Sequence, residues 1–137
     1  MAGEGEERPE VSVELVGQPS GGGPWHTTFR VTNVGKESID LRSAWMPHVV
    51  LHAEEIDLSQ SSSLAPEASM ELEFEVTYAP RDAPYEPPNP FLFLRLRWHG
   101  EEWRLVVQLS ISSGQVPPKL AVARINAHRI GFSSGLS

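Results

Sequence analysis

The chain has 137 residues, enough for one domain with its own hydrophobic core, and it carries a formal net charge of −7 at pH 7. An acidic surface repels phosphate groups, so the composition argues against general nucleic-acid binding. The absence of cysteine excludes a disulfide framework, a thiolate nucleophile and a cysteine-ligated zinc site.

Residues 1–10 are rich in glutamate and glycine and show no apolar periodicity, which predicts a disordered acidic arm. This start lacks the apolar core of a secretory signal. No stretch reaches the roughly 18 consecutive apolar residues that a membrane-spanning helix needs. We therefore expect a cytoplasmic protein without a membrane partner.

Strand patterns start at Val11, where apolar residues alternate with Ser12 and Glu14. The glycines and prolines of QPSGGGP predict a loop, and WHTTFRVTNVG then returns to alternation. Asn33 and Gly35 at its end tolerate the positive φ that a tight turn requires. The letters ESIDL predict the start of a further strand.

Residues 43–63 have a weaker pattern. Pro47 lacks a backbone donor, so it predicts a strand end or an edge position. The letters VVL fit a short buried strand, and Ile56 and Leu58 fit a second brief strand.

The segment LAPEASMELEFEVTYAP, residues 64–80, has the clearest strand pattern. Apolar residues alternate with acidic or hydroxyl residues, which gives one core face and one solvent face. A helix would scatter the same apolar residues around its circumference. The core face consists of Met70, Leu72, Phe74, Val76 and Tyr78. The glutamates on the other face discourage pairing with the sheet edge of another molecule.

The prolines of RDAPYEPPNP predict a stiff, extended connection. After it, FLFLRLRW and WRLVVQLSIS predict a hairpin with Gly100 in the turn. The alternation in all these segments predicts a core that contains Phe29, Val31, Leu72, Phe74, Val76, Leu94, Leu96, Leu105, Val107 and Leu109.

Short strands separated by turn signals, without an amphipathic helix, predict an all-β fold over residues 11–113. The expected architecture is an antiparallel β-sandwich of about seven strands. A small β-barrel needs a similar number of strands, so it stays open as the alternative.

FRVTNVGKESIDL, followed by LAPEASMELEFEVTYAP and the closing hairpin, resembles immunoglobulin-like modules of the CARDB and ASH (MSP-related) kind. In such modules a strand ends in N-x-G, and L-x-P-G precedes an alternating strand. Glu67 stands where that pattern favours glycine. The resemblance covers about residues 11–112 and implies a seven-strand, immunoglobulin-like sandwich that serves binding or assembly and has no catalytic residues.

The C-terminal extension, residues 114–137, combines large apolar residues with basic ones and contains no acid. A free, solvated tail is typically poor in large apolar side chains. We therefore expect the extension to dock on a sheet edge, either its own or that of a second copy. The residues expected to make such partner contacts are Leu120, Val122, Arg124, Ile125 and Arg129.

No pattern in the chain is typical of catalysis. His48 and His52 are separated by roughly 13 Å along a straight strand, which is too far to share a metal ion. The chain has neither a G-x-S-x-G elbow nor a phosphate-binding loop. We expect no catalytic residue, no metal and no cofactor, and thus a protein that is not an enzyme.

The leading hypothesis is a non-catalytic protein-interaction or assembly module whose partner is another protein or a second copy of this chain. The alternative is a β-sandwich that binds a small ligand or a carbohydrate through exposed aromatic side chains. The residues expected to bind such a ligand are Trp45, which lies in an irregular stretch and is expected to be exposed, and His48 and His52, which follow it closely.

Overall fold

The computed structural model describes residues 8–20, 25–48, 51–58, 63–78, 90–112 and 119–130, and all regular secondary structure in these residues is β-strand. The strands are β1 (Val11–Ser20), β2 (Trp25–Asn33), β3 (Ile39–Pro47), β4 (Leu51–Asp57), β5 (Ser63–Leu64), β6 (Ser69–Tyr78), β7 (Phe91–Trp98), β8 (Glu101–Ser112) and β9 (Lys119–Ile130). Every pairing between them is antiparallel. The predicted all-β, antiparallel class is therefore confirmed.

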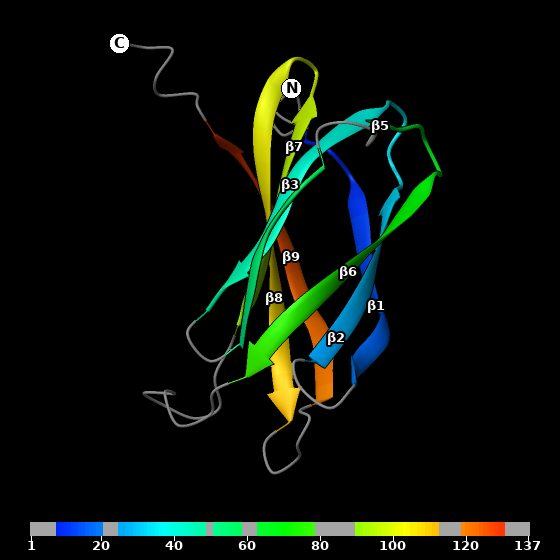
Figure 1. Ribbon diagram of the computed structural model, residues 1–137. Coiled ribbons are helices and arrows are strands. Elements are labelled where there is room, and N and C mark those ends of the chain that lie inside the picture. The colour runs from blue at the N-terminus through cyan, green and yellow to red at the C-terminus, as the bar shows by residue number, and fades with distance from the viewer. Residues whose placement is uncertain are drawn as a thin grey trace.

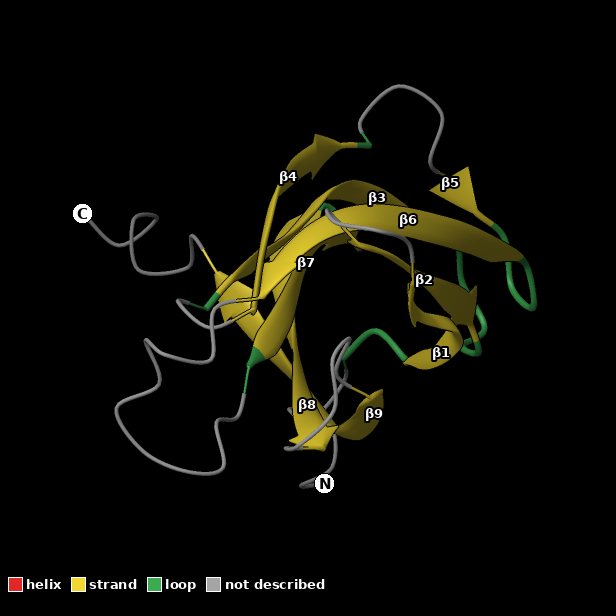
Figure 2. Cartoon of the chain, turned by 60° about the horizontal axis from the view of Figure 1, so that its bottom comes forward, coloured by secondary structure: helices red, strands yellow, loops and turns green. Residues whose placement is uncertain are grey.

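The strands pair in the order β1-β2-β6-β4-β3-β7-β8-β9, with β5 attached to β3. β6 joins the two halves, since it pairs with β2 along most of its length and, within the described residues, reaches β4 through Thr77 and Tyr78 alone. The sheet thus curls around one core into a nearly closed, barrel-like ring (Figure 1, Figure 2). The described residues hold nine strands rather than about seven, because β5 and the C-terminal β9 add to those expected.

The ring closes through the side chain of Gln18. Its Nε2 donates a hydrogen bond to the carbonyl of Leu120, and its Oε1 accepts one from the amide of Leu120, each at 2.8 Å. A carboxamide offers the same donor and acceptor as a backbone peptide group. Gln18 therefore replaces a rung of strand pairing between β1 and β9, the two ends of the pairing order.

β9 shows where the C-terminal extension goes. It pairs antiparallel with β8, from Lys119 opposite Ser112 to Ile130 opposite Glu102. The prediction that the extension docks on a sheet edge is confirmed for residues 119–130, and the edge belongs to the same chain. Residues 114–118 and 131–137 of the extension lie outside the described residues.

The core matches the alternation of the sequence. The ten residues expected in it are each 3% exposed or less. Phe74 of β6 meets Phe29 of β2 edge-on, with ring centroids 6.0 Å apart, near the centre of this core. The predicted hairpin is also confirmed, since β7 and β8 pair around His99 and Gly100, whose positive φ angles of 55° and 73° suit a two-residue turn.

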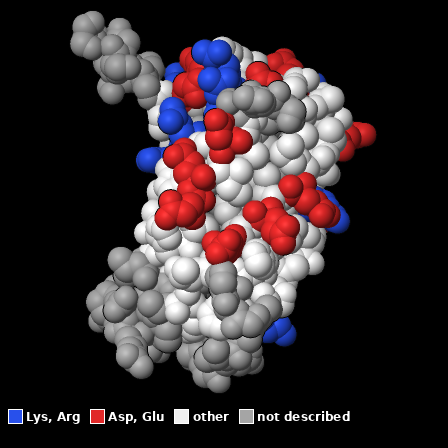
Figure 3. Space-filling model, viewed as in Figure 1, with Lys and Arg blue, Asp and Glu red and all other residues white. Residues whose placement is uncertain are grey.

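The outward face of β6 carries Glu71, Glu73 and Glu75, all exposed. Figure 3 shows acidic side chains spread over this side of the molecule, while the basic side chains in view lie mainly at its upper left. Among the described residues there is no helix long and apolar enough to cross a membrane.

Three segments differ from the expectation or fall outside the structure. Pro9 is buried and the carbonyl of Glu10 accepts a 3.0 Å hydrogen bond from the amide of Val34, so residues 8–10 pack against the domain rather than extending as a disordered arm. Residues 1–7 of that arm lie outside the described part, as do 79–89 of the proline-rich connection. The strand β4 (Leu51–Asp57) contains Ile56 of the second brief strand that was expected, whereas residues 49–50 of the expected VVL strand lie outside the described part.

Replacing Phe74 by alanine tests which face of β6 is buried. The side chain is 1% exposed, so its loss removes apolar burial and leaves a cavity. We expect Phe74→Ala to lower the free energy of unfolding by about 3–5 kcal/mol in urea titrations. Glu75→Ala on the opposite face is the control, with a change within about 0.5 kcal/mol. A loss below about 1 kcal/mol for Phe74→Ala would mean that the faces are reversed.

Candidate functional site

A hollow with a largely apolar lining lies where β1 and β9 separate. The two strands meet at Gln18 and Leu120 and diverge toward the upper end in Figure 1. At that end a groove of about 790 Å³ has Val11 of β1 and Ala127 of β9 among its lining residues. We call this hollow the β1–β9 groove.

Apolar side chains from distant parts of the chain line the β1–β9 groove. They are Pro9, Val11, Val34, Trp98, Leu105, Ile125 and Ala127. Val34 is 53% exposed, and the structure has only one other large apolar side chain that is exposed among the described residues, Val16 at 41%. The described residues thus leave this apolar surface partly open to solvent.

The polar rim of the groove is balanced in charge. Arg8 and Lys36 contribute positive charge, and Glu10 and Glu37 contribute negative charge. Glu37 also contacts the His99 ring, which ties the loop after β2 to the β7–β8 turn. A rim of balanced charge neither attracts nor repels a charged molecule strongly, so the apolar lining is the feature that distinguishes the groove.

On its side away from β8, the backbone of β9 has peptide groups that no other described strand pairs with beside the groove. The amide of Leu120 points away from β8, because it donates to Gln18. Along an antiparallel strand, successive residues point their peptide groups alternately toward the paired strand and away from it. On β8, the partners of Leu120, Ile125 and Ala127 are Ile111, Val107 and Leu105. These partners are separated by even numbers of residues, so all three β9 residues have the same orientation. The peptide groups of Ile125 and Ala127 therefore also point away from β8, toward the groove.

Asn33 fixes the loop that forms one wall of the groove. This side chain is fully buried, and its Oδ1 accepts a 2.9 Å hydrogen bond from the amide of Gly35. Its Nδ2 donates to the carbonyls of Glu37 and Leu64 at 2.8 and 2.9 Å. One carboxamide therefore holds the 34–37 loop against β5, and Val34 takes its exposed position as a consequence.

The backbone of Asn33 holds a second turn at the same place. Its amide donates to the carbonyl of Ala68 at 3.0 Å, and its carbonyl accepts from the amide of Glu67 at 2.7 Å. Glu67 has a φ of 73°, in the left-handed region that favours glycine. The turn before β6 is thus anchored to the end of β2.

The five residues expected to contact a partner all lie on β9, but they point in different directions. Leu120 is 2% exposed, and Val122 and Ile125 pack against the core of their own chain. Arg124 is exposed. Arg129 pairs with Glu101 at 3.4 Å and lies over the Trp103 ring. Of these residues, only Ile125 lines the groove.

Trp45, His48 and His52 lie around the β3–β4 connection. Trp45 is half-buried and meets Phe93 edge-on at 5.4 Å between ring centroids. His48 follows β3, and partial burial lowers its pKa below the ordinary value. His52 lies opposite Pro47 in the β3–β4 pairing. Among the described residues no group of three or more His, Asp or Glu side chains is placed to hold a metal ion.

Sequence reasoning missed the residues that shape the groove. Val34 and Gln18 both lie in stretches whose composition predicts only a turn or a loop. The N-x-G pattern at Asn33 did signal a reversal, but a local pattern does not reveal that the side chain also bonds to Leu64. No periodicity predicts a hydrogen bond between Gln18 and Leu120, residues 102 positions apart.

No protein-family model matches the chain, and a search of curated proteins found no match either. One solved structure is similar, described as "X-ray structure of Northeast Structural Genomics Consortium target SoR45". The two chains share 14% sequence identity, and the alignment covers 95% of this chain and 91% of that one, with a TM-score of 0.28.

Replacing Asn33 by aspartate tests the role of its carboxamide. The change removes the two hydrogen bonds donated by Nδ2 and sets a carboxylate oxygen against two carbonyls in a fully buried position. We expect Asn33→Asp to lower the free energy of unfolding by about 3 kcal/mol or more in urea titrations.

Asn126→Asp is the matched control for this substitution, because Asn126 is exposed on β9. It should change stability by no more than about 0.5 kcal/mol. Equal stability of the two variants would contradict the anchoring role of Asn33.

Proposed function

We propose that this chain is a non-catalytic interaction module that binds an extended segment of another protein in the β1–β9 groove. The observation that carries the proposal is the combination of an apolar groove with a strand edge whose peptide groups point into it, at Ile125 and Ala127. A partner strand would satisfy both features at once, because it offers backbone hydrogen bonds and side chains together.

Strand addition defines the chemistry of the partner. The segment would pair with β9 through its backbone and direct every second side chain into the groove, toward Leu105 and Val11. Apolar residues suit these inward positions, and polar residues suit the positions between them. Proline is unsuited to the centre of such a segment, because it lacks the backbone donor.

The immunoglobulin-like character of the fold belongs to the same proposal. Two groups of strands, β1-β2-β6 and β4-β3-β7-β8-β9, enclose the core and are joined by the short β4–β6 pairing. The left-handed φ of Glu67 suits the glycine that the CARDB and ASH pattern favours there. Both points support a kinship with binding and assembly modules.

The aromatic side chains on the outer face support the ligand-binding alternative less well. Trp45 stands at 82° to Phe93, whereas Phe91 is inclined by only 26° to the same ring. The three half-buried rings therefore do not form one flat surface on which a sugar or another planar ligand could stack. We favour the groove for this reason.

Replacing Val34 by aspartate tests the groove. Val34 is partly exposed, so the change should leave stability within about 0.5 kcal/mol of the wild type while it places a charge at the apolar lining. The probe is a random-peptide display library selected on the wild-type protein. We expect enriched peptides with apolar residues at alternate positions and no central proline, and at least about tenfold weaker binding to Val34→Asp.

Val16→Asp is the matched control, because Val16 is an exposed valine on β1 that does not line the groove. Its affinity for the selected peptides should equal that of the wild type. Failure to enrich any peptide, or equal loss of binding in both variants, would overturn the proposal.

A further inference from the structure

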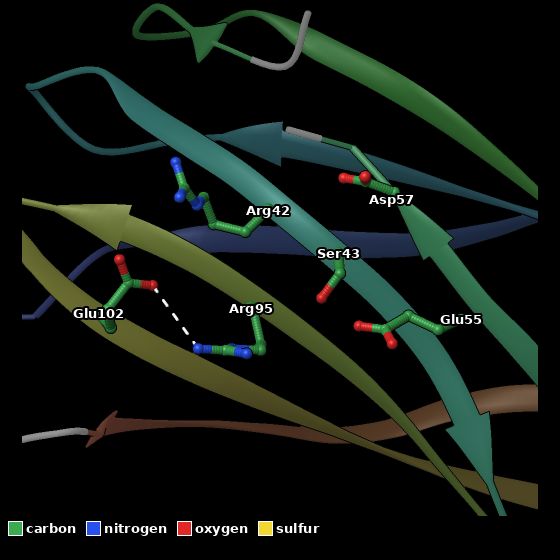
Figure 4. A pocket seen from close by; sticks show the side chains of 6 residues that line it. All are labelled: Arg42, Ser43, Glu55, Asp57, Arg95 and Glu102. Carbon is green, nitrogen blue, oxygen red and sulfur yellow. Dashed lines mark ion pairs between the residues drawn. The ribbon is translucent and has the colours of Figure 1, made fainter. Parts of the chain in front are cut away.

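A second hollow, of about 410 Å³, lies on the outer side of the sheet, away from the β1–β9 groove. It is lined by Arg42, Ser43, Glu55, Asp57, Arg95 and Glu102, from strands β3, β4, β7 and β8 (Figure 4). In contrast to the groove, every lining residue is charged or carries a hydroxyl. We call it the polar hollow.

The register of the sheet explains why the surface is hollow here. Ser43 of β3 lies opposite Asp57 of β4 on one side and Arg95 of β7 on the other. A serine between two larger, charged side chains leaves a depression, and Ser43, 7% exposed, lies at its centre. The register shift between Leu41 and Ser43 adds Arg42 as an extra residue on β3, and such a bulge redirects the side chains around it.

The charges around the polar hollow are only partly paired. Glu102 lies 4.0 Å from Arg95 and 3.4 Å from Arg97, so one carboxylate serves two guanidinium groups. Among the described residues, Arg42 and Glu55 have no oppositely charged side chain within 4.0 Å. In Figure 4 they lie on opposite sides of Ser43, Arg42 to one side and Glu55 to the other.

We propose that the polar hollow binds a small zwitterion, a molecule with a carboxylate and an ammonium group joined by a flexible chain. The carboxylate would be held by Arg42 and Arg95, since a guanidinium group matches a carboxylate with two parallel hydrogen bonds. The ammonium group would be held by Glu55 and Asp57, which come from β4 on the opposite side of Ser43. A molecule of this kind balances both unpaired charges, whereas a simple anion or cation balances only one.

The spacing of the strands sets the length of the ligand. β3 lies between β4 and β7, and neighbouring strands are about 4.8 Å apart, so the acidic and basic sides are separated by roughly 5–10 Å. An α-amino acid, with its charged groups on one carbon, is too short to span this gap. A longer ω-amino acid such as ε-aminocaproate fits it better.

The test is a titration of the full chain with ε-aminocaproate, followed by the backbone and arginine side-chain NMR signals. We expect shifts confined to the lining of the polar hollow, with affinity at least about tenfold higher than that of glycine, caproate or hexylamine. Each of these three control ligands lacks either the span or one of the two charges. Equal affinity for caproate or hexylamine would overturn the zwitterion proposal, and so would the absence of any shift.

Two single substitutions test each end of the ligand separately. Arg42→Gln and Glu55→Gln should each weaken ε-aminocaproate binding by about tenfold or more. The matched controls are Arg124→Gln and Glu73→Gln, which replace exposed side chains outside the polar hollow and should leave affinity unchanged. Unchanged affinity in both test variants would place the ligand elsewhere and contradict the assignment. Val34→Asp should also bind ε-aminocaproate normally, so the result is independent of the groove.

Discussion

The buried carboxamide of Asn33 is the interaction on which the open end of this fold depends. Its oxygen accepts from Gly35 and its nitrogen donates to the carbonyls of Glu37 and Leu64, so both polar atoms of the side chain are bonded to backbone groups. Because a buried polar group without partners is costly, this set of bonds has few alternative arrangements. The loop after β2 is therefore held rigidly, and it presents Val34 to solvent.

Asn33 and Gln18 act at opposite ends of the same gap in the ring. Gln18 of β1 bonds to the backbone of Leu120 and draws β1 and β9 together. Asn33 fixes the loop at the other end, where the two strands stand apart and the groove opens. Two carboxamides thus determine where the sheet is closed and where its edges remain available. A fully closed ring would offer no edge to a partner strand.

Strand alternation predicted the buried faces correctly, because every second side chain of a strand is buried and this pattern is visible within a few neighbouring residues. It placed Phe74 in the core, and the apolar residues of the extension correctly indicated a docked segment. The order of the strands is not local, so no periodicity placed β6 between β2 and β4. The polar hollow was missed for the same reason, since Ser43, Glu55 and Arg95 come together only through cross-strand register.

Amide hydrogen exchange along β9 tests most directly the claim that this strand keeps a free edge beside the groove. The account predicts slow exchange for Arg124 and Asn126, whose peptide groups face β8, and fast exchange for Ile125 and Ala127, whose peptide groups face the groove. The Leu120 amide should be protected by Gln18 despite pointing away from β8. Equally slow exchange at Ile125, Asn126 and Ala127 would show that the edge is already paired and would contradict the account.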